Sequence, residues 1–86
     1  MGLGRRLRVI MKNDNPALSA WVGKRIKLFR SSRGITQEQL AEYSGLHRTY
    51  IGACERGEKN ITIMNLSVIC NHLHISLKTF FDDEIY

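Results

Sequence analysis

The sequence predicts an all-α domain of five short helices, residues 16–86, preceded by a basic arm, residues 1–15. Three observations carry this prediction. Apolar residues recur at spacings of three and four, which is typical of amphipathic helices. A serine, threonine or asparagine precedes four of the apolar segments, as expected of helix N-caps, and a glycine follows three of them. No stretch alternates for long enough to indicate a strand.

The first helix is expected to start at Pro16 and to end near Arg33 and Gly34. Asn15 followed by Pro16 is a strong start signal, because asparagine caps helices and proline fits their first position. Gly34 can adopt the left-handed conformation that closes a helix. One apolar face follows spacings of four, four and three: Leu18, Val22, Ile26 and Phe29.

The second and third helices are expected to be short and separated by a glycine turn. Thr36 and Gln39 fit a capping box, and the second helix should stop at Gly45. The third should run from His47 or Arg48 to Glu55 and be closed by Gly57. Ala41 should lie where these two helices approach closely. The residues expected to hold the pair against the first helix are Leu40, Leu46, Ile51 and Cys54.

The last two helices follow threonine and serine caps. Thr62 precedes a fourth helix whose expected apolar face contains Ile63, Leu66, Ile69, Cys70 and Leu73. Ser76 precedes a short fifth helix that carries Leu77, Phe80 and Phe81. These three residues exceed what one small core needs, which predicts an exposed apolar patch and a homodimer interface. The alternative is that Phe80 and Phe81 fold back under the first helix.

Charge and composition restrict the class of partner. The net charge is +5 over 86 residues; residues 1–59 carry +7 and residues 60–86 carry −2. This polarity favours a polyanionic partner. No apolar run approaches the roughly 18 residues of a membrane span, so we expect no membrane segment. Cys54 and Cys70 fall in apolar segments and are typical of core residues in a reducing, cytoplasmic protein.

Catalytic and metal-binding patterns are lacking in the sequence. It has no phosphate-binding loop and no nucleophile–base set, so we expect no enzyme, no cofactor and no small-molecule ligand. Cys70, His72 and His74 are close in sequence, but His72 would point away from the other two on a helix. We therefore expect no metal site.

Two short helices joined by a glycine turn form a helix-turn-helix, in which the third helix would project its N-terminal end. An α-helix fits the major groove of B-DNA, and its first residues reach the base edges. Arg48 is the best candidate for bidentate binding of guanine, with a phosphate contact as the alternative. Thr49 could meet a thymine methyl or a base edge. Tyr50 could contact the DNA backbone or be an aromatic residue at the edge of the core.

The stretch "GITQEQLAEYSGLHRTYIGACERG" resembles the lambda-repressor-like, Cro/C1-type (XRE) helix-turn-helix family over roughly residues 20–81. Its signature residues stand at the family's spacing: Gln37, Leu40, Ala41, Gly45, Ile51, Glu55 and Gly57. "LHRTYIGACERGEKNITIMNL" is similar to the controller proteins of restriction-modification systems. The chain departs from them at His47, where aspartate, serine or threonine is more usual, and in its longer arm.

The resemblance implies a transcription regulator that binds a pseudo-palindromic site on double-stranded DNA as a homodimer. Alternatives are a phage-type repressor or an antitoxin that also binds a protein. Gln37 resembles the family's phosphate-contacting glutamine, although it could be a solvated first-turn residue. In addition to Arg48, Thr49 and Tyr50, the implied DNA-binding positions are Ala53, Arg56, Lys59 and Asn60. Ala53 is small and could only permit close approach, and any one of the other three could be plain surface. The family also pairs an arginine of the first helix with a glutamate of the third, which implies a structural ion pair between Arg30 and Glu55.

Overall fold

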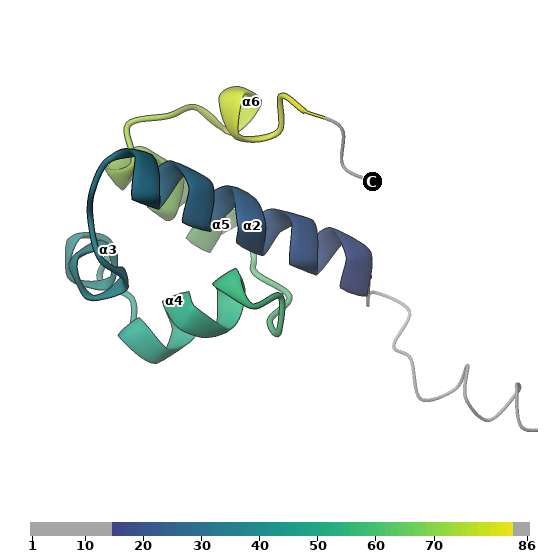
Figure 1. Cartoon of the computed structure of the whole chain (residues 1–86), viewed down its shortest axis with the longest axis horizontal. Coiled ribbons are helices and arrows are strands. Elements are labelled where there is room, and N and C mark those ends of the chain that lie inside the picture. The colour runs from purple at the N-terminus through teal and green to yellow at the C-terminus, as the bar shows by residue number, and fades with distance from the viewer. Residues whose placement is uncertain (1–14, 84–86) are drawn as a thin grey trace, which may run out of the picture.

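The computed structural model describes residues 15–83, so the arm before Asn15 lies outside the described residues. The described part contains five helices: α2 (Pro16–Ser32), α3 (Gln37–Ser44), α4 (Arg48–Glu55), α5 (Ile63–His72) and α6 (Leu77–Phe80) (Figure 1). The all-α prediction is confirmed. None of these helices is long and apolar enough to cross a membrane.

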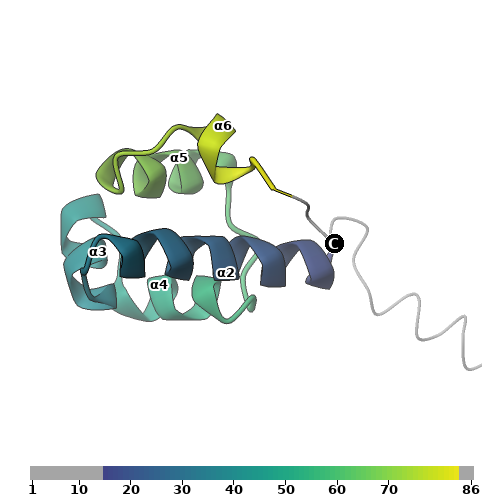
Figure 2. The same cartoon turned by 45° about the horizontal axis from the view of Figure 1, so that its top comes forward.

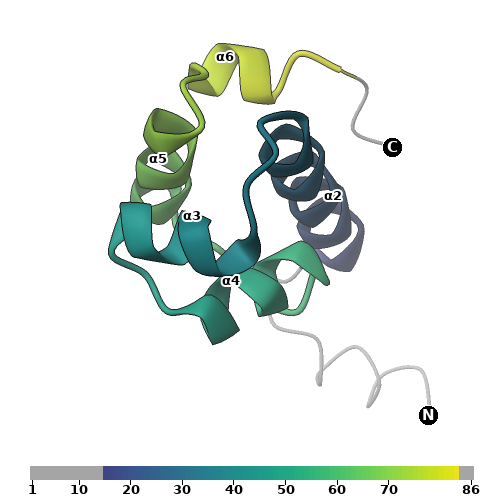
Figure 3. The ribbon, with the colours of Figure 1, turned by 60° about the vertical axis from the view of Figure 1, so that its left-hand side comes forward.

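α2 is the long central helix of the domain. α4 and α6 lie on opposite sides of it, and α5 stands across the domain from α2 (Figure 3). Figure 2 shows α5 and α6 together on the side of α2 that faces away from α4. The helix-turn-helix pair, α3 and α4, therefore forms one side of the molecule.

The helix ends follow the predicted capping signals. The Asn15 side chain accepts a hydrogen bond from the backbone N–H of Leu18 at 3.1 Å. Thr36 and Gln39 form the reciprocal capping box, with N···O distances of 3.0 and 2.8 Å. Gly45 closes α3 with a φ of 72°, a conformation that costs glycine little. These local interactions fix the start of α2 and both ends of α3.

The core fills the space between α2 and the other helices. Its members are all buried: Val22, Ile26, Leu40, Ala41, Ile51, Cys54, Leu66, Ile69, Cys70, Leu73 and Phe80. Both cysteines are free thiols inside this core, as expected. Burial raises the pKa of the Cys70 thiol to about 11. The core thus holds the helix-turn-helix pair against α2 and α5.

α2 and α4 approach each other at a glycine. A Cβ atom on Gly23 would lie 2.4 Å from the backbone oxygen of Cys54 and 2.6 Å from that of Glu55. Real Cβ atoms do not come so close to backbone atoms, so only glycine allows this helix crossing. Gly23 therefore sets how closely the end of α4 packs on α2.

Two predictions about the apolar residues are wrong. Ile63, expected in the core, is 58% exposed, whereas Phe80, expected in an exposed dimer patch, is 0% exposed. Phe80 packs edge-on against Trp21, with ring centroids 6.1 Å apart, and lies 6.0 Å from Phe29. Phe81 stacks on Trp21 at 5.6 Å and is half-buried. Trp21 and Phe29 of α2 thus pack against Phe80, and Trp21 also packs against Phe81, as the fold-back alternative predicted.

Arg25 fastens α6 to α2. Its Nε donates to the backbone oxygen of Phe80 at 2.9 Å, and its guanidinium lies 5.3 Å from the Trp21 ring and 4.9 Å from the Phe29 ring. A looser ion pair joins Arg25 to Asp83 at 3.4 Å. These contacts place α6 on the side of the molecule opposite α4.

Candidate nucleic-acid interface

A buried ion pair joins α2 to the last residue of α4. Arg30 and Glu55 form a two-point contact, with Nε–Oε2 at 2.6 Å and Nη2–Oε1 at 3.0 Å. Their side chains are only 12% and 4% exposed. Arg30 also donates from Nη1 to the backbone oxygen of Ile35 at 2.8 Å, ahead of α3. The hydrogen bond to Glu55 raises the pKa of Arg30. The pair implied by the resemblance is present and holds both helices of the motif.

Gln37 extends this network to the first turn of α3. Its Nε2 donates to Oε1 of Glu55 at 2.9 Å, and the side chain is half-buried. It is therefore more than a solvated first-turn residue. An amide nitrogen carries two hydrogens, so one remains for another acceptor. The first N–H groups of a helix also lack intrahelical partners, which favours an anion at this end of α3.

The N-terminal end of α4 is open to solvent. His47 is the N-cap residue, but its side chain makes no capping hydrogen bond. Arg48 and Thr49 are exposed at this end. Arg48 Nη1 lies 3.7 Å from Oε2 of Glu38, and both side chains are more than 60% exposed, at 62% and 65%. The helix thus presents a cation, a hydroxyl and uncapped backbone N–H groups on one exposed end.

Tyr50 and Ala53 expose less surface than Arg48 and Thr49, and Tyr50 fits the alternative of an aromatic residue at the edge of the core. Tyr50 is half-buried, and its hydroxyl accepts a hydrogen bond from Nδ2 of Asn65 on α5 at 3.1 Å. Burial raises the pKa of Tyr50. Ala53 is 6% exposed and offers almost no surface of its own, which fits the alternative that it only permits close approach. The chain turns back over this part of α4, because the N–H of Glu58 donates to the Ala53 oxygen at 2.9 Å.

The other end of α4 carries a second ion pair. Arg56 donates from Nε and Nη2 to the two carboxylate oxygens of Glu58, at 2.9 and 3.1 Å. Here the side chains are 59% and 56% exposed. Lys59 follows and is exposed. This segment is basic at Arg56 and Lys59, but Glu58 places a carboxylate between them.

Arg56 and Gln37 come together over Gly52. A Cβ atom on Gly52 would lie 3.2 Å from Nη1 of Arg56 and 3.4 Å from Oε1 of Gln37. The missing side chain thus leaves room for a guanidinium and an amide from different helices. The guanidinium can donate hydrogen bonds to a phosphate, and Gln37 can do so only through the second hydrogen of Nε2, because its Oε1 is an acceptor and Nε2 already donates to Glu55. This is the best candidate for a phosphate contact.

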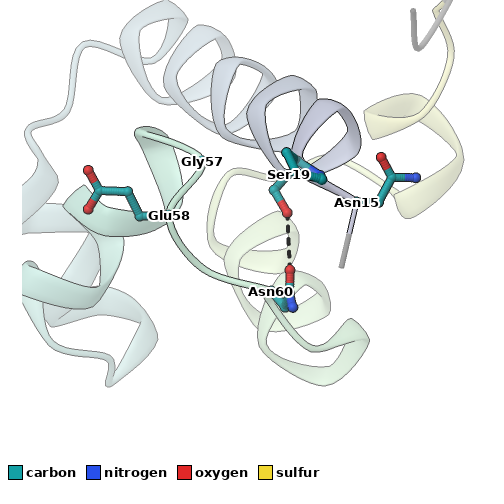
Figure 4. Close-up of a pocket in the computed structure, with 6 residues that line it drawn as sticks. Asn15, Ser19, Gly57, Glu58 and Asn60 are labelled. Carbon is teal, nitrogen blue, oxygen red and sulfur yellow. Dashed lines mark hydrogen bonds between the residues drawn. The ribbon is translucent and has the colours of Figure 1, made fainter. Parts of the chain in front are cut away.

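Asn60 belongs to a shallow pocket between the loop after α4 and the start of α2. Figure 4 shows Asn15, Ser19, Gly57, Glu58 and Asn60 around it. The Ser19 hydroxyl lies 3.2 Å from Oδ1 of Asn60, within hydrogen-bond distance. Asn60 therefore ties the loop to α2, a role that its position in the sequence did not indicate.

The arrangement of α3 and α4 defines a helix-turn-helix DNA-binding domain. Residues 26–80 match the helix-turn-helix family model, which is more than half of the chain. The chain belongs to the Cro/C1-type (XRE) helix-turn-helix family of DNA-binding transcription regulators.

Its similar relatives include controllers of restriction-modification systems. Control protein C.SmaI of Serratia marcescens is 43% identical over 56 residues, which span 65% of this chain and 67% of that protein. The controller protein C.AhdI of Aeromonas hydrophila has a TM-score of 0.71 and 35% identity, with 73% of this chain and 96% of that one covered. The controller C.Esp1396I was solved as a tetramer with its natural 35 base-pair operator; it has a TM-score of 0.71 and 43% identity, with 76% and 86% covered.

Sequence reasoning missed the residues that support the site. The Arg56–Glu58 pair, the Gln37–Glu55 hydrogen bond and the anchoring of Tyr50 by Asn65 were not anticipated. For the first, Gly57 predicts the left-handed turn that ends the helix, but not the ion pair formed by the side chains on either side of it.

Proposed function

We propose that this chain is the controller of a restriction-modification system and binds operator DNA as a homodimer. The observation that carries the proposal is the exposed N-terminal end of α4 held by the buried network at its other end. The controller relatives support it, because C.SmaI and C.Esp1396I are each 43% identical to this chain. C.Esp1396I was solved on its own operator.

In this function Arg48 and Thr49 read base edges in the major groove. Arginine forms two hydrogen bonds to guanine, and the threonine methyl or hydroxyl meets a neighbouring base. Gln37, Arg56 and Lys59 hold the phosphate backbone and fix the register of α4. Tyr50 supports α4 through its hydrogen bond with Asn65, and Asn60 supports the loop through its hydrogen bond with Ser19. In this proposal a small set of hydrogen-bond donors contacts the DNA, and the hydrogen bonds inside the protein hold them in place.

The homodimer contact is better placed on α5 than on α6. Ile63, Met64 and Val68 are 58%, 72% and 36% exposed, and Met64 and Val68 share one face of the helix. Such apolar exposure on a small domain is typical of an interface. Phe80 is unavailable because it fills the core, and Leu77 and Phe81 are half-buried. A second copy seated on α5 leaves α4 free for DNA (Figure 3).

Selection from a pool of random duplexes tests the DNA-binding part of the proposal. We expect an enriched pseudo-palindrome whose half-sites lie about one helical turn, roughly 34 Å, apart. The same element should occur upstream of the gene for this protein. Enrichment of no common sequence would contradict sequence-specific binding.

Sedimentation tests the homodimer. Met64→Asp places a charge in the expected interface and should give a folded monomer. This monomer should bind a full palindromic site far more weakly than the wild-type protein does. Val68→Asp should act in the same direction with a smaller effect, because Val68 is less exposed. Asp82→Asn, beyond α6 and outside the expected interface, is the control. A wild-type protein that sediments as a monomer at tens of micromolar would contradict the proposal.

A further inference from the structure

The two-point ion pair between Arg56 and Glu58 occupies the donor atoms of Arg56 that a phosphate would bind. Nε and Nη2 point at the two oxygens of Glu58, at 2.9 and 3.1 Å. A carboxylate and a phosphate bind a guanidinium in the same side-by-side geometry. The two acceptors therefore compete for the same edge of Arg56.

The backbone holds Glu58 in this position. Gly57 has a φ of 76°, its N–H donates to the oxygen of Cys54 at 3.0 Å, and the N–H of Glu58 donates to the oxygen of Ala53 at 2.9 Å. This pair of bonds is the Schellman ending of a helix. A Cβ atom on Gly57 would lie 2.9 Å from Cα of Ala20, so the turn also packs closely on α2. The fold thus fixes the backbone of Glu58 beside Arg56, while its side chain is exposed.

The paired arginine stands at the candidate phosphate contact. Its Nη1 lies beside Gln37 over Gly52, while Nε and Nη2 are turned to Glu58. Both side chains of the pair are more than half exposed. Exposed ion pairs are weak, so a DNA phosphate can displace the carboxylate.

We propose that Glu58 is an internal competitor of DNA phosphate for Arg56 and so limits the affinity of this protein for DNA. This inference rests on the proposed function. Binding exchanges one carboxylate for one phosphate at the guanidinium, and the released Glu58 carboxylate, already more than half exposed, is then solvated by water. Arg56 contributes less to affinity than an unpaired arginine at the same place.

Glu58→Gln tests the competition, because it keeps the size of the side chain and removes its charge. We expect about two- to fivefold tighter binding of both a random duplex and the selected site, as suits the loss of an exposed pair. The slope of log affinity against log salt should steepen by up to about one. Asp82→Asn removes the same charge beyond α6 and should change neither quantity. Fluorescence anisotropy over a series of salt concentrations measures both.

A double-mutant cycle with Arg56→Ala separates competition from simple charge repulsion. If Glu58 acts through Arg56, the gain from Glu58→Gln disappears when Arg56 is alanine. A gain that persists in the Arg56→Ala background overturns the proposal, since the carboxylate would then repel DNA directly. Weaker or unchanged binding by Glu58→Gln also overturns it, since Glu58 would then position Arg56 or do nothing.

The controls distinguish this proposal from the proposed function. Wild-type protein that shows no salt-dependent DNA binding contradicts the function and the competition together. Wild-type protein that selects a site, while Glu58→Gln gains nothing, contradicts the competition alone. Circular dichroism should show the same helix content in all variants, because the two side chains are exposed.

Discussion

Two neighbouring residues at the end of α4 form ion pairs with almost the same geometry in opposite surroundings. Glu55 meets Arg30 through two N–O contacts of 2.6 and 3.0 Å, and Arg56 meets Glu58 through two of 2.9 and 3.1 Å. The first pair is 12% and 4% exposed, and the second is 59% and 56% exposed. From the contact distances alone, one would expect the two pairs to contribute equally to stability.

Burial separates their roles. The inner pair is tied to Ile35 and Gln37 by further hydrogen bonds, so its charges cannot move without loosening α2, α3 and α4 together. The outer pair belongs to one turn, and water screens it. The same chemistry therefore serves as a structural joint on one side of α4 and as an exchangeable contact on the other.

Breaking the inner pair on one side should have the largest effect. Arg30→Met leaves the Glu55 carboxylate buried with only the Gln37 amide as its described partner, and we expect a loss of about 3–5 kcal/mol in the free energy of unfolding. The double change Arg30→Met with Glu55→Leu should recover much of this loss. Thermal and urea melts measure both.

Arg56→Met is the matched control for that experiment, because it breaks the outer fork in the same way. Its thermal midpoint should stay at the wild-type value. A silent Arg30→Met variant, or one that melts like Arg56→Met, would show that burial does not separate the pairs.

Two glycines extend the comparison from charges to packing. Gly23→Ala drives a methyl into the backbone oxygens of Cys54 and Glu55 and should cost about 1–3 kcal/mol of stability. Gly52→Ala meets only the ends of the Arg56 and Gln37 side chains, which can move. Helix propensity then favours alanine, so stability should hold or rise slightly while DNA affinity falls. Equal stability losses in the two variants would contradict this assignment.

How well the sequence predicted the molecule depends on the range of the interaction. Caps and turns such as Thr36 with Gln39 and the ending at Gly45 involve residues close in sequence, and their side-chain types alone indicated the helix boundaries. Ile63 and Phe80 were placed wrongly because helical spacing shows which residues share a face but not which face is covered. For Phe80 the answer came from Trp21 on α2, whose contact with it depends on the tertiary packing.

The residues of the candidate site also divide into those indicated by local sequence signals and those that depend on tertiary packing. The exposed end of α4 with Arg48 and Thr49 follows from a glycine turn and a short apolar stripe, which are local signals. Ala53 and Glu58 depend on how the chain turns back after α4, which the apolar pattern does not report. The inner ion pair spans 25 residues and was indicated only by resemblance to the family.

Arg48 and Lys59 sharpen the comparison among exposed cations. Arg48→Ala should cost about 1–3 kcal/mol on the selected site and relax preference at one base pair in each half-site. Lys59→Ala should weaken the selected site and random DNA alike and make the salt slope shallower by about one. Binding titrations on both duplexes distinguish them. If both variants weaken the two duplexes equally, α4 is not the recognition helix.

The smallest expected effect concerns pH and the outer pair. The hydrogen bond from Arg56 lowers the pKa of Glu58 below the ordinary value of a glutamate. A lowered pKa means that the pair is complete above the ordinary value and is lost only as pH falls through the lowered one. From about pH 6 to about pH 8 the carboxylate is therefore charged throughout, well above the ordinary range of glutamate. The ratio of DNA affinities of Glu58→Gln and wild type should then be constant over this range. Anisotropy titrations of the two proteins side by side measure this ratio. A ratio that falls towards one at the acidic end would show that a group other than the Glu58 carboxylate controls Arg56.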